Sequence, residues 1–259
     1  SFGKSQYEEI KQKILSSPVI HADETGGREN GRNGYFWNFS NTTHQFLAYR
    51  HSRGSKVVRE VLGVDGENFE GVLTTDFYAA YNEYSGFHQR CWVHYLRDIH
   101  GLEEEYPNDK ILKTWSKDIH RIYEKAKQDA GPPDNVPIGL QEQMREEEEA
   151  LFKKQLTNIC TPYLGQQTVF STLNARALKY ISELFTFIRF PNILSDNNLA
   201  ERSLRHIVVS RKISGGTRSK KGSETKSVLA SLFGTWRLQN LNPFEQTRNL
   251  LLQASSGAG

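Results

Sequence analysis

Three consecutive segments rich in aromatic and β-branched residues constrain the fold more than any other feature of this 259-residue chain. Turn-forming stretches, residues 26–34 and 41–43, separate these segments from one another. Short apolar segments bounded in this way are typical of β-strands joined by turns. We therefore expect three antiparallel strands within "SSPVIHADETGG" (16–27), "YFWNFS" (35–40) and "HQFLAYRHS" (44–52).

After the third segment the pattern changes to an alternation of helices and strands. Valines at helical spacing predict a helix over 55–63, and the next strand breaks into a helix at Asp76. A fifth short strand leads into a helix within 88–102, and residues 101–190 are polar and helical. Three closing helices are predicted over 191–212, 225–239 and 242–253.

This order of elements predicts an α/β fold, an RNase H-like mixed sheet flanked by helices. A large all-helical insertion precedes the last core helix. We expect residues 1–100 and 191–252 to form the core, 101–190 the insertion and 253–259 a flexible tail.

Charge is distributed unevenly along the chain, although the net charge is only +3. Residues 201–226 contain eight Lys and Arg against two Glu, and residues 101–150 contain thirteen acids against seven bases. The basic stretch favours a polyanionic partner. Alternatively, both stretches are ordinary solvated helical faces.

Two features of the composition bear on location. Cys91 and Cys160 are too few for a disulfide framework, which favours a reducing cytoplasm. No run approaches eighteen apolar residues, and the charged start "SFGKSQYEEIKQKI" lacks the apolar region of a signal peptide. We therefore expect a soluble protein with no membrane partner.

Three acids lie at positions that such a fold brings together. Asp23 lies in the first strand, Asp76 at the carboxyl end of the fourth, and Glu201 on the helix after the insertion. The first and fourth strands are neighbours in this kind of sheet. Carboxylates suit Mg²⁺, and two such ions roughly 3.5–4 Å apart can clamp a phosphodiester during in-line displacement. We therefore predict that these three residues are catalytic metal ligands.

Each acid also has a structural explanation. Asp76 can cap the helix that follows it, and Glu24 competes with Asp23 for the inward face of its strand. Alternation favours Asp23, which shares a face with Val19. Glu201 can instead form a pair at helical spacing with a neighbour on its own helix.

The helix that contains Glu201 has an apolar stripe at Ala200, Leu204 and Ile207. Glu201 lies at the edge of this stripe, in line with Asn197 and Arg205 at spacings of four residues. A carboxylate at the rim of a buried face points into a cleft, and this favours a metal ligand over a surface ion pair.

Five segments in this order resemble the transposases of the insertion sequence 66 family. "DNNLAER" is the most specific part, and "TTDFYAAYN" is the next most specific. The resemblance extends from about residue 18 to about residue 250. The segments are "HADET" (21–25), "TTDFYAAYN" (74–82), "CWVHYLRD" (91–98), "SDNNLAERSLRHIVVSRK" (195–212) and "GSETKSVLASLFGTWRLQNLNPFEQ" (222–246).

The resemblance implies an RNase H-like catalytic domain with an Asp-Asp-Glu triad, at Asp23, Asp76 and Glu201. It implies two Mg²⁺ or Mn²⁺ ions, hydrolysis at transposon ends to free a 3′-hydroxyl, and attack of that hydroxyl on target DNA. The expected partner is double-stranded DNA, with assembly of a homo-oligomer on it and no small-molecule substrate. The expected location is the prokaryotic cytosol or nucleoid.

Two other functions stay open: an RNase H-like nuclease that does not join strands, and a catalytically silent protein that binds DNA or assembles with partners. Family members also have an N-terminal region with DNA-binding helices. Nothing of that kind is visible in this sequence, so we expect the catalytic part only.

Further candidates surround the triad. Cys91 and His94 are half of a zinc motif, and by resemblance His94 orients a carboxylate or the scissile phosphate; alternatively, both are packed. Asn197 and Asn198 orient ligands or begin the helix, and Arg205 neutralises phosphate or holds Glu201. Phosphate contacts are predicted for Arg202, Arg211, Lys212, Arg218, Lys220 and Lys221, several of which flank a glycine-rich loop.

The helical insertion has its own candidates for contact with DNA or a second subunit. These are basic and aromatic residues of one predicted helix: Lys113, Trp115, Lys117, Arg121 and Tyr123.

Overall fold

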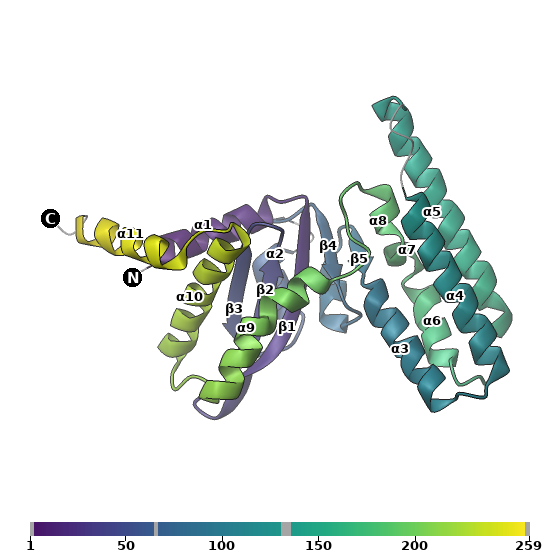
Figure 1. Ribbon diagram of the computed structural model, residues 1–259, viewed down its shortest axis with the longest axis horizontal. Helices are drawn as coiled ribbons and strands as arrows, with labels where there is room; N and C mark the ends of the chain where they lie inside the picture. Colours follow the sequence, from purple (N-terminus) through teal and green to yellow (C-terminus); the bar gives the residue numbers. More distant parts are fainter. Residues whose placement is uncertain (1–2, 65–66, 131–135, 257–259) are drawn as a thin grey trace. The chain divides into compact units, whose positions relative to one another are not determined.

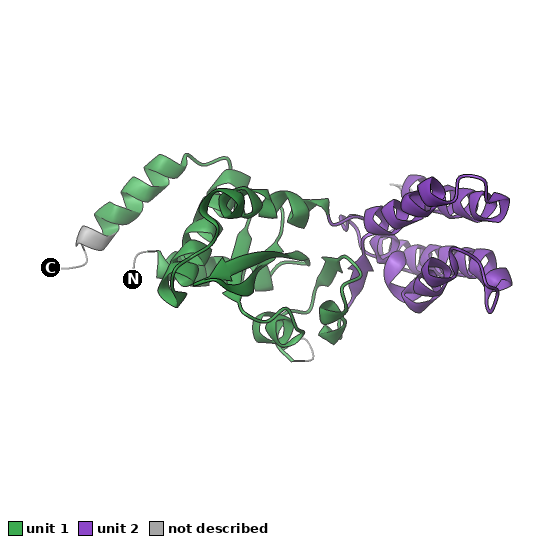
Figure 2. Ribbon diagram, turned by 90° about the horizontal axis from the view of Figure 1, so that it is seen from below, with its two compact units in different colours: residues 1–86, 198–259 green, residues 87–197 purple. Residues whose placement is uncertain are grey.

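The computed structural model describes residues 3–64, 67–130 and 136–256 (Figure 1). The chain forms two compact units (Figure 2). Unit 1 contains residues 1–86 and 198–259, and unit 2 contains residues 87–197. Unit 2 therefore extends further at both ends than the predicted insertion over 101–190.

The strands of unit 1 form a mixed sheet in the order β3-β2-β1-β4. These strands are β1 (Val19–Glu29), β2 (Arg32–Ser40), β3 (Gln45–Arg50) and β4 (Val72–Thr75). β1 pairs antiparallel with β2 and parallel with β4, and β2 pairs antiparallel with β3. The three antiparallel strands and the mixed sheet predicted from the sequence are confirmed.

The first hairpin is longer than predicted. Residues 26–34 were expected to form a turn, but β1 continues to Glu29 and β2 begins at Arg32. The turn is only Asn30 and Gly31, with φ angles of 48° and 77°. An Asn-Gly pair with two positive φ angles matches the right-handed twist of a two-residue hairpin. The glycines at 26 and 27 are therefore strand residues.

The sheet of unit 1 separates two apolar clusters. Ile20, Trp37 and Leu73 pack on one face with α1 (Lys4–Leu15) and α2 (Lys56–Leu62). The other cluster combines side chains of β2 and β3 with Leu204 and Ile207 of α9 (Asn198–Ser214). The helix predicted over 191–212 therefore begins seven residues later than expected.

Helix α10 (Lys220–Leu238) covers the edge of the sheet at β3 (Figure 1). Hydroxyls of Ser227, Ser231 and Thr235, four residues apart, accept hydrogen bonds from alternate β3 amides, those of Tyr49, Leu47 and Gln45. Four helical residues rise about 6 Å, and two strand residues rise about 6.6 Å, so the two spacings match. These bonds occupy backbone donors that an uncovered edge strand exposes.

Helix α11 (Pro243–Ser256) completes unit 1. The flexible tail was predicted over 253–259, but residues 253–256 belong to this helix, and residues 257–259 lie outside the described residues. No helix among the described residues is long and apolar enough to cross a membrane.

Unit 2 is mainly helical and has its own aromatic core. Trp92 stacks on Tyr123, and Trp115 stacks on Phe170. Because Trp115 and Tyr123 are buried, the prediction that they contact DNA or a second subunit is wrong. The described elements of unit 2 are β5 (His88–Arg90), α3 (Trp92–Glu105), α4 (Lys110–Asp129), α5 (Ile138–Cys160), η2 (Thr161–Tyr163), α6 (Ser171–Lys179), α7 (Ile181–Leu184) and α8 (Thr186–Arg189).

The hydroxyls of Ser227, Ser231 and Thr235 on α10, which accept hydrogen bonds from β3 and are called the hydroxyl ladder below, give a stability prediction. Ser231→Ala leaves the buried amide of Leu47 without its acceptor, which should lower the free energy of unfolding by about 1–3 kcal/mol. Urea unfolding followed by circular dichroism measures this change. Thr225→Ala, on the exposed side of the same helix, is the control and should stay close to wild type. Equal stabilities of the two variants would show that the ladder contributes nothing.

Candidate active site

The register of β1 against β4 brings two of the predicted ligands to the same end of the sheet. The parallel ladder pairs Val19 with Val72 and His21 with Thr74, an offset of 53 residues. Asp23 and Asp76 have the same offset, and each lies two residues after the last pair of this ladder, His21 and Thr74. Neighbouring residues of parallel strands point to the same face. Asp23 and Asp76 therefore lie at the same end of the sheet, where the charge of Asp76 acts on Asp23.

The adjacent Glu24 lies on the opposite face of β1. Its side chain is only 2% exposed and accepts hydrogen bonds from Arg53 at 2.7 Å and from the Tyr81 hydroxyl at 2.6 Å. The Arg53 guanidinium also lies over the ring of Tyr78. Glu24 is thus part of an ion pair within the fold, and Asp23 occupies the face predicted for it.

Glu201 reaches the same face of the sheet from α9. This helix packs on β1 and β2, and its stripe of Ala200, Leu204 and Ile207 is buried as predicted. The side-chain amide of Gln45 donates hydrogen bonds to Asn38 on β2 and to the carbonyl oxygen of Ser203 on α9. This buried bridge fixes the helix to the sheet two residues after Glu201.

The carboxylates influence one another electrostatically. Burial is the main cause that raises the pKa of Asp23 to about 7, and the negative charges of Glu24, Asp76 and Glu201 contribute to the same rise. The backbone amide of Glu24 donates a hydrogen bond to Asp23 at 2.8 Å, which opposes the rise. A carboxyl that holds its proton near neutral pH because it is buried and lies near other acids has the electrostatics of a site that favours a cation.

The three carboxylates fit a hard divalent cation in their chemistry, because they supply only oxygen donors. The three side chains are not grouped closely enough to hold an ion as they stand. Among the described residues, no group of three or more His, Cys, Asp or Glu is arranged to hold a metal ion. The fit therefore rests on the kind of donor and on the raised pKa of Asp23. A bound cation would have to draw the carboxylates inward.

Asp76 also has a structural role. Its carboxylate accepts a hydrogen bond of 2.9 Å from the backbone amide of Tyr78. This bond shapes the turn before the short helix η1 (Ala79–Glu83), where the sequence predicted a helix that begins at Asp76. The capping role and the predicted ligand role use the same side chain, and one carboxylate has enough acceptor sites for both.

The supporting residues are divided between the units. Asn198 is the first residue of α9, and Arg205 is exposed on that helix. His94 and Asn197 belong to unit 2, where the backbone amide of Asn197 donates a hydrogen bond to the Cys91 sulfur. Their predicted roles toward the carboxylates stay predictions.

Cys91 has the environment of a packed thiol. It is fully buried at the start of α3, and burial raises its pKa to about 11. A metal ligand must be a thiolate, so this environment disfavours the half zinc motif.

Among the predicted phosphate contacts, Arg211 differs from the others. Its guanidinium donates a 2.8 Å hydrogen bond to the carbonyl oxygen of Gly26 on β1, so it connects α9 to the sheet. The glycine-rich loop after α9 is also attached, because Thr217 pairs through its backbone with Arg28 and Asn30. The remaining candidates are exposed: Arg202, Lys212, Arg218, Lys220 and Lys221.

Sequence reasoning missed three parts of this region. It did not pair Glu24 with Arg53, although an acid beside a predicted ligand needs a partner when it is buried. It also missed the positions of Lys226 and His206, which line an open groove between α9 and α10.

The chain matches the family model described as "Transposase IS66 family" over residues 4–225. It is 22% identical over 96% of its length to the uncharacterized protein y4qI of Sinorhizobium fredii (strain NBRC 101917 / NGR234). It is 28% identical over 61% of its length to the uncharacterized protein y4jO of the same organism. The alignments cover 50% and 46% of those proteins, so the chain spans about half their length. No solved structure matches the chain.

The raised pKa of Asp23 predicts how stability depends on pH without divalent metal. The unfolded chain loses this proton near pH 4, but the folded chain keeps it until about pH 7. The free energy of unfolding should therefore fall between these values, by on the order of a few kcal/mol, and then level off. Asp23→Asn should remove this fall, so that the variant gains stability relative to wild type as pH rises.

Urea unfolding in EDTA from pH 5 to 8.5 measures this difference. Glu142→Gln, an acid-to-amide change at an exposed position of α5, is the matched control. Parallel stability curves for wild type and Asp23→Asn would contradict the prediction.

Proposed function

The chain belongs to the transposase IS66 family, and we propose that unit 1 is the catalytic domain of a DDE-type DNA transposase. In this proposal the domain hydrolyses a phosphodiester at transposon ends to free a 3′-hydroxyl. That hydroxyl then attacks a phosphodiester of target DNA, and the bond it forms replaces the one that breaks. The sheet of unit 1, antiparallel in its first three strands and parallel at β4, supports an RNase H-like fold.

The register of β1 against β4 is the observation that supports this proposal most strongly, because its last pair, His21 and Thr74, lies two residues before Asp23 and Asp76. Strand β1 supplies Asp23, Asp76 directly follows β4, and α9, which packs on β1, supplies Glu201. Ligands on regular elements are held more precisely than ligands on loops.

In this proposal Asp23, Asp76 and Glu201 hold the metal. When bound, a pair of Mg²⁺ or Mn²⁺ ions supplies activation of the attacking hydroxyl and neutralises charge on the phosphate. Asp23 releases its proton as the cation binds, which makes binding dependent on pH. The exposed cations near the start of α10 and on α9 hold the DNA backbone, a contact that positions DNA without reading its sequence.

Charge-only changes at the carboxylates test the catalytic role. Asp76→Asn keeps an oxygen that can accept the hydrogen bond from the backbone amide of Tyr78, but it removes the negative charge. We expect it to lose Mn²⁺ binding in calorimetry and to lower metal-dependent DNA cleavage by at least about a hundredfold. Glu201→Gln should behave in the same way, and Glu142→Gln is the control.

The outcomes separate the candidate functions. Joining of precut ends by wild type supports a transposase, and cleavage without joining indicates a nuclease. If Asp76→Asn matches wild type and Asp76→Ala only unfolds more readily, Asp76 is a cap and the catalytic proposal fails.

Salt dependence tests the DNA contacts. If Lys212 and Lys221 each neutralise one phosphate, Lys212→Gln and Lys221→Gln should each lower the slope of log K against log salt by about one. Fluorescence anisotropy with duplex DNA between low and moderate salt measures the slope. Lys125→Gln, an exposed change on α4, is the control, and an unchanged slope in all three variants would exclude these contacts.

A further inference from the structure

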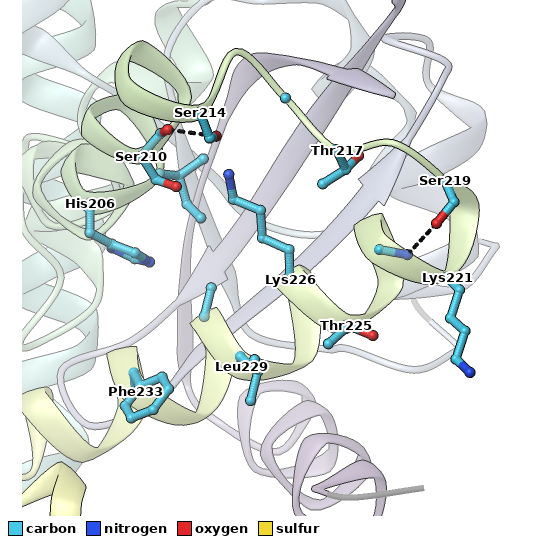
Figure 3. Close-up of a pocket in the computed structure, with 14 residues that line it drawn as sticks. His206, Ser210, Ser214, Thr217, Ser219, Lys221, Thr225, Lys226, Leu229 and Phe233 are labelled. Atoms are coloured by element: carbon cyan, nitrogen blue, oxygen red, sulfur yellow. Dashed lines mark hydrogen bonds between the residues drawn. The ribbon is translucent and has the colours of Figure 1, made fainter. Parts of the chain in front are cut away.

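An open groove of about 750 Å³ lies between α9 and α10, both in unit 1 (Figure 3). Its volume lies within the range of roughly 300–1,000 Å³ of pockets that hold small molecules. Ile207, Leu229, Ala230 and Phe233 make its floor apolar. The Phe233 side chain is 41% exposed, so an aromatic face is accessible there.

The rim of this groove has a positive charge. Figure 3 shows the side chain of Lys226 extending from α10 toward Ser210 and Ser214 of α9. Lys221 also lines the groove, although its side chain points away from Lys226 in Figure 3, and several serine and threonine hydroxyls line the groove as well. No Asp or Glu occurs among the described residues that line the groove. Cations and hydroxyls above an apolar floor suit a ligand that is both anionic and flat.

Helix α9 connects this groove to the carboxylates. Glu201 and Ser210 are nine residues apart, so at about 100° per residue they lie on opposite sides of the helix. The buried stripe lies between them on the sheet side. On the outer side, Arg202 and Arg205 are exposed between the Glu201 edge and the groove edge. A nucleic-acid backbone that crosses the outer side of α9 would meet these arginines.

We propose that the groove between α9 and α10 binds one nucleotide of single-stranded DNA. The base rests on the floor beside Phe233, and its phosphate lies beside Lys226. This inference rests on the proposed function, because it assigns the groove to a strand that leads away from the catalytic carboxylates.

Single-stranded DNA is favoured over a duplex for a steric reason. A duplex presents sugars and phosphates to its surroundings and keeps the faces of its bases stacked. Only an unpaired base can place its face on an apolar floor. Stacking of this kind tolerates any sequence, as expected for a contact that holds a strand without reading it.

Anisotropy of a short labelled oligonucleotide in EDTA tests the proposal without any catalytic step. Phe233→Ala should weaken single-strand binding by about tenfold, since one stacked base is lost. Phe244→Ala removes an exposed phenylalanine from α11 and is the matched control. Lys226→Met should weaken binding more than Lys125→Met, because Lys125 is exposed on α4 and is outside the groove. Circular dichroism checks that each variant is folded.

An oligonucleotide without bases provides a second comparison. Wild type should bind it about as weakly as Phe233→Ala binds the normal strand. Equal affinities of Phe233→Ala and Phe244→Ala, an equal loss on duplex DNA, or no binding of single strands by wild type would each overturn the proposal. If the groove binds single strands but wild type cleaves no DNA with metal, the groove assignment stands and the catalytic proposal fails.

Discussion

Pairing of β1 along both of its edges is the constraint on which the candidate site depends. Antiparallel pairing with β2 and parallel pairing with β4 leave this strand no freedom of register. Alternation along the strand then sends Asp23 to the face covered by α9 and Glu24 to the opposite face. A shift of one residue would exchange them. The Arg53 ion pair and the Tyr81 hydroxyl bond stabilise the observed arrangement, because they bind Glu24 on its own side.

Much of unit 1 could be predicted because its signals are local. Alternation in β1 indicated the correct face for Asp23, and helical spacing indicated the buried stripe of α9. The first turn was misplaced because glycines at 26 and 27 look like turn residues, and only the pairing partner shows that they continue the strand. The start of α9 was also misplaced, since helix boundaries carry weak signals.

Other features could not be predicted because they depend on contacts between distant residues. A basic side chain such as Arg211 gives no sign in the sequence that its partner is a carbonyl oxygen of β1. The burial of Trp115 and Tyr123 follows from packing within unit 2. The match between hydroxyls of α10 and amides of β3 needs both elements in place, although the four-residue spacing of Ser227, Ser231 and Thr235 is visible in the sequence.

Glu24, Asp76 and Glu201 surround the buried Asp23, and this arrangement lowers the stability of the fold. Contacts elsewhere in the fold offset the loss. Burial beside like charges disfavours the ionised carboxyl, and a sequence selected for stability alone would avoid it. Contacts around Asp23 hold the backbone in place on both faces of the sheet. The ion pair of Glu24 with Arg53 does so on one face, and the hydrogen bond from Gln45 to α9 does so on the other. Regions that break local rules while their supports are well satisfied are where function is expected. The contrast between the raised pKa of Asp23 and its ordered surroundings therefore supports the proposed cation site more strongly than the presence of three acids does.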